Sequence, residues 1–242
     1  MNILALDTSM GACSAALLRE NGGATTLVTR EVQMTRGHAE ALMPMLEAVM
    51  DEAKFDFAEL DLIAATLGPG SFTGVRVAIA AARGLALATE ARLWGTDSLT
   101  VMAQGVLAKC AGAPFAISVD AHRGMLYLGL FDSVGARLEG PLLLSPEDAA
   151  AKISRNLHAA FGSGAAILAH AASDIGIEID ASSPELQPVA ANLAVLALQA
   201  NASLPRPPRR FLSRPTSGAR LTGSPWSPMT VGSSFGIPTP PG

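Results

Sequence analysis

Cysteine, aromatic residues and charge are all scarce in this sequence of 242 residues. Its two cysteines, Cys13 and Cys110, are too few for a disulfide framework or for a cysteine-built zinc site. Charged residues make up 16% of the chain and the formal net charge is -4, which excludes a general basic surface for gripping nucleic acid. The sequence shows no signal-peptide pattern and no run that resembles a membrane span. These absences predict a soluble, cytoplasmic protein without a membrane segment.

Acidic residues are missing altogether from the last 40 positions. Residues 203–242 contain nine of the 16 prolines and five arginines, so residues 1–202 carry 12 basic and 21 acidic side chains, a net charge of -9. We interpret residues 205–242 as a Pro/Gly/Ser-rich tail without a packed core. A natural disordered extension and a shifted reading frame both remain open as its origin.

The histidines are not spaced to bind a metal from one helix. The four are His38, His122, His158 and His170, and the closest two are 12 positions apart. A one-turn pair is therefore absent, and so is a nucleophile elbow in the right context. We predict no metal, no cofactor and no catalytic residue.

Two segments read as strand, turn and strand, with an aspartate at the same place in each. The first covers residues 3–18 and contains Asp7; the second covers residues 115–131 and contains Asp120. The match indicates an internal duplication or a coincidence. The carboxylates could hold magnesium and a nucleotide, but the turn after Asp7 has no lysine or arginine to meet phosphates. We favour turn formers or vestiges of phosphate loops.

The other periodic segments alternate between helix and strand, which predicts an α/β fold with two lobes. Helices are expected over residues 38–52, 73–89, 98–109 and 188–202, and another starting after Ser145; strands are expected over 60–67, 93–95 and 164–169.

The run from Leu67 to Arg76 is a glycine-rich loop that joins a buried strand to a helix. Its glycines and the free N–H groups of the helix start could bind an anion or a phosphate. The spacing matches neither a P-loop nor a dinucleotide fingerprint. We favour a tight turn in which Ser71 or Thr73 caps the helix.

The helix that follows is rich in alanine, and Arg76 and Arg83 share one of its faces. Small residues let a second helix approach closely, so this helix is either a contact surface or an ordinary core helix with two solvated arginines.

Several segments of this sequence resemble the bacterial TsaB family. They are residues 3–9, 38–44, 67–76 with Gly84, 95–99, and Asp120-Ala121 with Gly124 and Tyr127. The resemblance extends from residue 1 to about 204 and implies the two-lobed actin/Hsp70-like ATPase fold, with a ribonuclease H-like sheet in each lobe. It divides the chain into an N-terminal, partner-binding lobe (1–108), a smaller C-terminal lobe (109–204) and the tail (205–242).

The resemblance also implies a function in forming N6-threonylcarbamoyladenosine (t6A) at position 37 of tRNAs that read ANN codons. The chain would be a non-catalytic, cytoplasmic partner of the transferase subunit TsaD, joined by the ATPase TsaE, and would meet tRNA only within that complex. A homodimer through the same helices is a further expectation. The alternative is a nucleotide-hydrolysing or glycoprotease-like enzyme of the same superfamily.

Two groups of candidate site residues follow. The partner interface would contain His38, Leu42, Met45, Arg76, Ala78, Ala81, Ala82 and Arg83, although we favour a plain helix-start role for His38. The vestigial phosphate loops would contain Asp7, Thr8, Ser9, Gly68, Gly70, Ser71, Thr73, Gly74 and Asp120.

Overall fold

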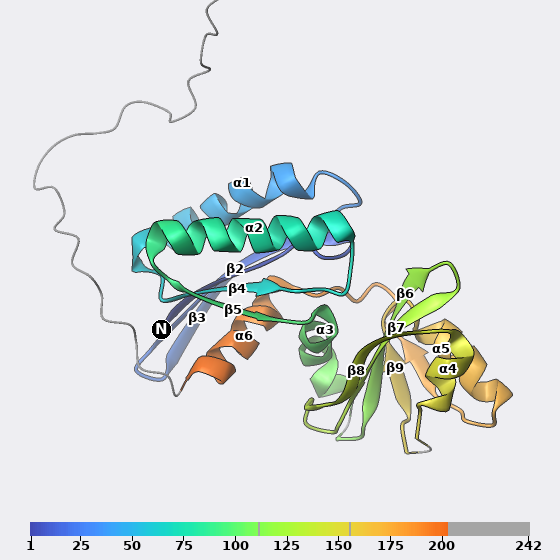
Figure 1. Ribbon diagram of the computed structural model, residues 1–242. Coiled ribbons are helices and arrows are strands. Elements are labelled where there is room, and N and C mark those ends of the chain that lie inside the picture. Colours follow the sequence, from blue (N-terminus) through green and yellow to red (C-terminus); the bar gives the residue numbers. More distant parts are fainter. Residues whose placement is uncertain (111, 155, 203–242) are drawn as a thin grey trace, which may run out of the picture. The chain divides into compact units, whose positions relative to one another are not determined.

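The computed structural model describes residues 1–110, 112–154 and 156–202 (Figure 1). The tail predicted from residue 205 onward lies outside these ranges. The described residues form two five-stranded sheets with helices packed against them. The chain is therefore a mixed α/β protein, as the sequence predicts.

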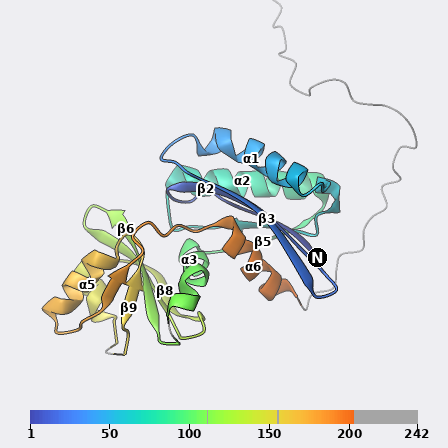
Figure 2. The same cartoon turned by 180° about the vertical axis from the view of Figure 1, so that it is seen from behind.

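The first sheet has the strand order β3-β2-β1-β4-β5 (Figures 1 and 2). Its strands are β1 (Asn2–Asp7), β2 (Ala12–Asn21), β3 (Ala24–Gln33), β4 (Leu62–Thr66) and β5 (Arg92–Thr96). The first three pair antiparallel, whereas β4 runs parallel to β1 and β5 parallel to β4. The hairpin expected around Asp7 is confirmed.

The second sheet repeats this arrangement, with the order β10-β9-β6-β7-β8. Its strands are β6 (Phe115–His122), β7 (Met125–Phe131), β8 (Arg137–Leu144), β9 (Ala159–Phe161) and β10 (Asp180–Ser182). Here β6, β7 and β8 pair antiparallel, and β9 and β10 continue in parallel from β6. The same order and directions in both sheets support a duplication over a coincidence.

Six α-helices lie between and after the described strands. They are α1 (His38–Glu52), α2 (Phe72–Thr89), α3 (Ser98–Val106), α4 (Pro146–Ala151), α5 (Ala165–Asp174) and α6 (Ala190–Asn201), with short 3-10 turns at Phe57–Glu59 and Leu107–Lys109. Helices α1 and α2 cover one face of the first sheet and α6 covers the other (Figures 1 and 2). Apolar residues on both faces of β1 and β2 make these strands the centre of the first core.

Two helices cross the division expected from the sequence. Helix α6, placed by number in the second lobe, packs on the first sheet through Leu193 and Ala197. Helix α3, placed in the first lobe, shares a core with Phe115 of β6 through Leu99 and Met102.

The strand expected over residues 164–169 is wrong, because α5 occupies this region. Five of the ten residues of α5 are alanine, the best helix former. Strands β3 and β8 were missed: most residues of β3 are exposed, and half of those of β8 are. Edge strands of this kind carry no clear alternation of apolar and polar residues.

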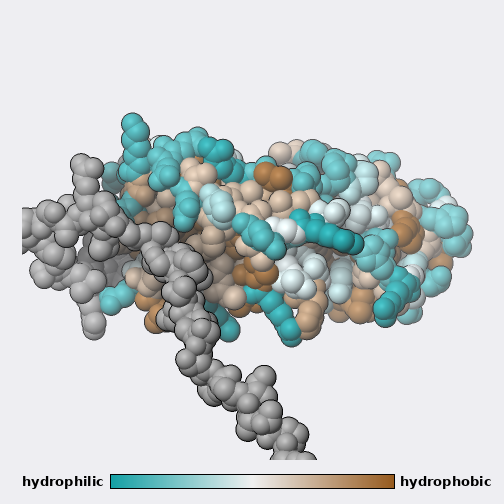
Figure 3. Space-filling view, turned by 90° about the horizontal axis from the view of Figure 1, so that it is seen from above, coloured by the Kyte–Doolittle hydropathy of each residue, from teal (hydrophilic) through white to brown (hydrophobic). Residues whose placement is uncertain are grey.

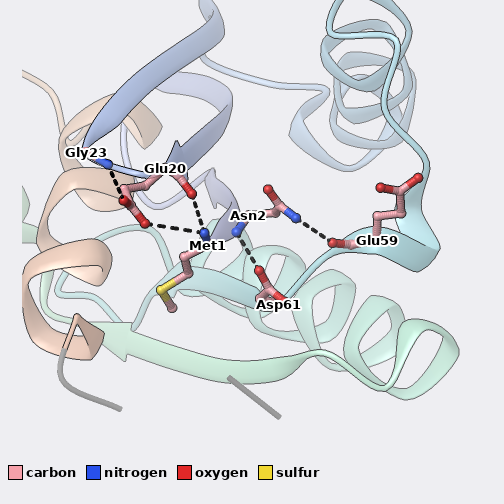
Figure 4. Close-up of polar contacts among 6 residues, drawn as sticks. All are labelled: Met1, Asn2, Glu20, Gly23, Glu59 and Asp61. Atoms are coloured by element: carbon pink, nitrogen blue, oxygen red, sulfur yellow. Dashed lines mark hydrogen bonds and ion pairs between the residues drawn. The ribbon is translucent and has the colours of Figure 1, made fainter. Parts of the chain in front are cut away.

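Polar contacts fix the start of β1 between its neighbours (Figure 4). The Asn2 backbone N–H donates to Asp61 Oδ2 at 2.7 Å, and Asn2 Nδ2 donates to the Glu59 carbonyl at 2.9 Å. The N-terminal amine of Met1 donates to the Glu20 carbonyl on β2. The buried Asp61 side chain is thus satisfied by the backbone of the adjacent strand.

Helix α2 is apolar but little buried. Its 18 residues have a mean hydropathy of 1.3, so by length and composition it could cross a membrane. In the structure 22% of this helix is buried. The buried residues include Ala78, Ala82 and Ala86, which pack on the first sheet, as in a soluble α/β domain. Figure 3 looks down on this side of the molecule and shows beige and brown surface among teal side chains.

Candidate functional site

The turn after β1 lies directly against the glycine loop between β4 and α2. The Ser71 N–H donates to the Ser9 carbonyl at 2.7 Å, and Thr8 Oγ1 donates to the Gly74 carbonyl at 2.7 Å. A Cβ at Gly70 would lie 2.1 Å from the Ser9 oxygen, and a Cβ at Gly74 would lie 1.9 Å from the Thr8 oxygen. Glycine is therefore required here for contact between two backbones.

Several of the N–H groups that could have bound a phosphate are used inside the protein. Ser71 N–H binds the hairpin, and Gly74 N–H donates to Ser71 Oγ at 3.3 Å, so Ser71 is the helix cap. Thr73 is exposed and does not serve as the cap. The carbonyl of Gly68, at φ 90°, accepts from Ser98 N–H at 2.9 Å. These contacts support the tight-turn interpretation of the loop.

Asp7 is fully buried beside this contact. Its Oδ2 accepts hydrogen bonds from Thr66 Oγ1 and from Ser9 Oγ, the latter at 2.8 Å, and its Oδ1 accepts from Ser9 N–H at 3.2 Å. Ser98 Oγ in turn donates to Ser9 Oγ at 3.1 Å. The carboxyl thereby links β1 to β4 and to the start of α3.

Burial raises the pKa of Asp7 from 3.8 to about 6, because the charged form loses its hydration. The hydrogen bonds from Thr66 and Ser9 lower the pKa and offset part of this effect, while the charge of Glu31 raises it slightly. No cation pairs with Asp7 among the described residues. We read the side chain as part of the fold.

Asp120, the counterpart in the second hairpin, is partly exposed at a cavity of about 450 Å³. The cavity is lined by Met10, Gly11, Gly70, Ser71, Val119, Asp120, Ala121, His122, Tyr127, Ser163, Leu186 and Gln187. Asp7 does not line it, so the two predicted carboxylates do not face one site. A phosphate in this cavity would meet a carboxylate and neither lysine nor arginine. The described residues contain no group of three or more His, Cys, Asp or Glu side chains placed to hold a metal.

His38, expected at a partner interface, contacts the protein's own first hairpin. Its Nε2 lies 3.0 Å from the Met10 carbonyl, within hydrogen-bond distance, and the residue is half-buried. This contact ties the start of α1 to the turn that lines the cavity, and it agrees with a plain helix-start role.

Four of the other predicted interface residues are buried in the protein's own core: Leu42, Met45, Ala78 and Ala82. Their side chains pack against the first sheet, so they do not provide surface to a partner. Arg76 and Arg83 are exposed, and Ala81 is half-buried. The outer face of α2, and not its alanine face, is the available surface.

The exposed apolar residues beside these arginines were missed from the sequence. Phe72 is 71% exposed and Leu87 is 86% exposed, at the two ends of α2. Arg76 lies over the Phe72 ring, 3.5 Å from its centroid. Next to α2, Arg83 and Leu93 help to line a second cavity of about 250 Å³. Counting back four positions from Arg76 and forward four from Arg83 would have found both ends of this face.

Two copies of one five-stranded unit, with helices on both faces of the first sheet, define the class of the protein. It has the two-lobed actin/Hsp70-like fold with ribonuclease H-like sheets, as the resemblance implies. The structure of YeaZ from Pseudomonas aeruginosa is 30% identical, with a TM-score of 0.71, and the match covers 84% of this chain and 94% of that one. A structure described as an uncharacterised Pseudomonas aeruginosa protein with similarity to peptidase YeaZ has a TM-score of 0.72 at 30% identity, covering 83% and 92%.

The family model for TsaD, described as tRNA N6-adenosine threonylcarbamoyltransferase, matches residues 31–204. The tRNA threonylcarbamoyladenosine biosynthesis protein TsaB of Escherichia coli is 35% identical over 127 residues, which are 52% of this chain and 53% of that protein. The TsaB protein of Bacillus subtilis is 31% identical over 140 residues, 57% and 58% respectively. The matched region spans about half the length of these curated relatives. The chain belongs to the TsaB family, which is part of the larger group of proteins that the TsaD family model matches.

Proposed function

We propose that this chain is a non-catalytic partner subunit of TsaD, required for t6A formation at position 37 of tRNAs that read ANN codons. The names of its relatives support a role in making this modified nucleoside. The observation that carries the partner role is the outer face of α2, which leaves most of an apolar helix uncovered. An exposed apolar surface of this kind marks an interaction site.

The geometry around the hairpins supports a non-catalytic role. Asp7 is buried and saturated with hydrogen bonds, and the glycine loop uses the N–H groups of Ser71 and Gly74 within the fold. Neither group is free to act on a substrate. Chemistry would then belong to TsaD.

The remaining expectations form part of the same proposal. TsaE joins through the complex with TsaD in the cytoplasm, and tRNA is met only there, because residues 1–202 carry a net charge of -9. The N-terminal lobe of residues 1–108 provides the partner surface, with α6 added to it because α6 packs on the first sheet. The smaller lobe, expected over residues 109–204, loses α6 in this proposal and covers residues 109–189, and the tail is still proposed over residues 205–242.

A matched pair of substitutions tests the partner surface. Leu87→Arg places a charge on the outer face of α2, whereas Val134→Arg places one at a similarly exposed apolar position, 71% exposed, near the second sheet. We expect Leu87→Arg to reduce co-purification with TsaD and t6A levels in a depleted strain complemented by this chain. Val134→Arg should leave both unchanged. Equal behaviour of the two variants would contradict the assigned surface.

A second candidate function, a nucleotide-hydrolysing or peptidase-like enzyme, would have to use the cavity beside Asp120. Its polar lining, with Ser71 and Ser163, could hold a small ligand. Isothermal titration of the purified chain with ATP and magnesium tests this alternative. Tight binding that Asp120→Asn removes would favour the enzyme. Light scattering with and without TsaD tests the homodimer.

A further inference from the structure

The two helices that cover the first sheet carry opposite charges on their outer surfaces. Helix α1 has four exposed acidic residues and neither lysine nor arginine: Glu40, Glu47, Asp51 and Glu52, the last of which pairs with Arg30 of β3 at 2.7 Å. Helix α2 has two exposed arginines, Arg76 and Arg83, and no acidic residue. Both helices pack into the same core on one side of the sheet (Figure 1). An acidic ridge (α1) and a basic ridge (α2) therefore run along one layer.

The spacing within the two ridges is the same. Glu40 and Glu47 are seven positions apart on α1, as Arg76 and Arg83 are on α2, so each pair shares a helix face two turns long. None of these four residues forms an ion pair within the described part of the chain. Their charges remain available to a binding partner.

The arginines of the basic ridge are placed for binding by apolar neighbours. The Phe72 ring lies under the Arg76 guanidinium, and such a contact orients a guanidinium without neutralising it. Arg83 lies at the apolar cavity beside Leu93. Along the ridge, the two arginines therefore lie between two exposed apolar side chains, Phe72 at one end and Leu87 at the other. Arginine flanked by aromatic and aliphatic groups is typical of the residues that dominate interface energies.

We propose that the basic ridge of α2 binds a helix of the TsaD subunit that presents two carboxylates two turns apart, while the acidic ridge of α1 faces basic side chains of the same subunit. The inference rests on the proposed function and specifies its chemistry. A long, straight helix face fits a second helix packed along it. If the partner docked the other way round, its carboxylates would face α1 and its basic side chains would face α2, and the repulsion between like charges disfavours that orientation. The two ridges thus determine the orientation of TsaD on the layer.

The acidic ridge also argues against a membrane as the occupant. An apolar helix with two arginines would suit an anionic lipid surface. Glu40, Glu47 and Asp51 lie on the same layer, however, and would face the same headgroups. A protein partner can place basic groups opposite α1, whereas an anionic lipid surface repels these carboxylates.

Charge reversal on the full-length chain tests the proposal. The dissociation constant for TsaD is measured by isothermal titration at 50 and 500 mM NaCl for the wild-type chain, Arg76→Glu/Arg83→Glu, and Glu40→Lys/Glu47→Lys. We expect each reversal to weaken binding by about tenfold or more at low salt, and the wild-type affinity to fall as salt rises. Arg76→Lys/Arg83→Lys keeps the charges and should bind within a few-fold of the wild type. Lys109→Glu/Arg123→Glu changes the net charge by as much as Arg76→Glu/Arg83→Glu, at positions outside this layer, and is the matched control for that variant.

The outcomes separate this inference from the proposed function. A wild-type chain that does not bind TsaD overturns both. Binding that is as strong for Arg76→Glu/Arg83→Glu as for the control overturns the charge pairing and leaves the partner role intact. Light scattering that shows self-association lost in Arg76→Glu/Arg83→Glu, and regained when Glu40→Lys/Glu47→Lys is added, would assign the ridges to a second copy instead. Preferential binding to vesicles of phosphatidylserine would assign them to a membrane.

Discussion

The buried carboxyl of Asp7 makes the stability of this protein depend on pH in an unusual direction. Because the pKa of Asp7 is raised from 3.8 to about 6, the folded state binds a proton more tightly than the unfolded chain. The stability that Asp7 contributes is complete below pH 3.8 and is lost as the pH rises through about 6. A difference of about two pKa units corresponds to about 3 kcal/mol of unfolding free energy.

Asp7→Asn removes this titration and keeps the shape of the side chain. The amide oxygen can still accept from Ser9 N–H, and the hydroxyls of Ser9 and Thr66 can turn to accept from the amide. We expect the unfolding free energy of the wild type, relative to the variant, to fall by about 2 kcal/mol between pH 4 and pH 7, since part of the full change lies below pH 4. The unfolding free energy of the variant minus that of the wild type is therefore larger at neutral pH than at pH 4.

Urea unfolding followed by circular dichroism, at unit steps from pH 4 to pH 8, measures the difference. Asp120→Asn in the second hairpin is the control for the same chemical change at a partly exposed position. A wild-type-minus-variant difference for Asp7→Asn that stays constant across this range would refute the reasoning.

Further predictions concern the glycine loop and a helix cap, and thermal and urea unfolding check them. Gly74→Ala should destabilise the protein by on the order of 4 kcal/mol, because its Cβ would lie 1.9 Å from the Thr8 carbonyl oxygen. Gly84→Ala, in the same helix but with no atom within 4 Å of the added Cβ, should instead stabilise by up to about 1 kcal/mol. Ser145→Ala should cost about 1 kcal/mol, because Ser145 Oγ accepts from Asp148 N–H at the start of α4. A loss at Gly84 as large as that at Gly74 would contradict the steric argument.

The sequence predicts the parts of the fold whose signals are local. Both hairpins, the ends of α1 and the cap of α4 at Ser145 follow from apolar runs and capping residues, and all agree with the structure. Strands β3 and β8 could not be found in this way: β3 is exposed along almost its whole length, and β8 is interrupted by Gly140 and Pro141. Their pairing depends on backbone hydrogen bonds to β2 and β7, and side-chain patterns carry little information about such bonds.

The interface residues show a different limit. Small residues in α2 indicate that something packs closely, but they do not tell whether the neighbour is the protein's own sheet or a partner. Ala78, Ala82 and Ala86 follow a spacing of four and face the sheet. Arg76 and Arg83 lie on a flank of the helix, about 100° around its axis from this alanine stripe, and are exposed. Only the burial of each residue in the structure shows which side of α2 packs on the protein's own sheet and which side is exposed.

The glycine loop has a counterpart in the second half of the fold, which explains why the two aspartates differ. Gly162, Ser163 and Gly164 follow β9 as the first loop follows β4. Gly164 N–H donates to the Ser118 carbonyl at 3.0 Å, and Ser163 Oγ accepts from Asp120 N–H at 3.1 Å. Each hairpin is thus held by the loop that opens the next helix, as expected of a duplicated unit.

The two loops hold their hairpins differently. In the first half the loop contacts the turn through the backbones of Thr8 and Ser9, which follow the aspartate, and Asp7 is enclosed. In the second half the loop contacts the strand up to Asp120, and the turn beyond it remains exposed at the cavity. One aspartate became a component of the core because its turn is covered, whereas the other kept its access to solvent. Any ligand of the cavity must therefore be recognised through Asp120 and its neighbours and not through Asp7.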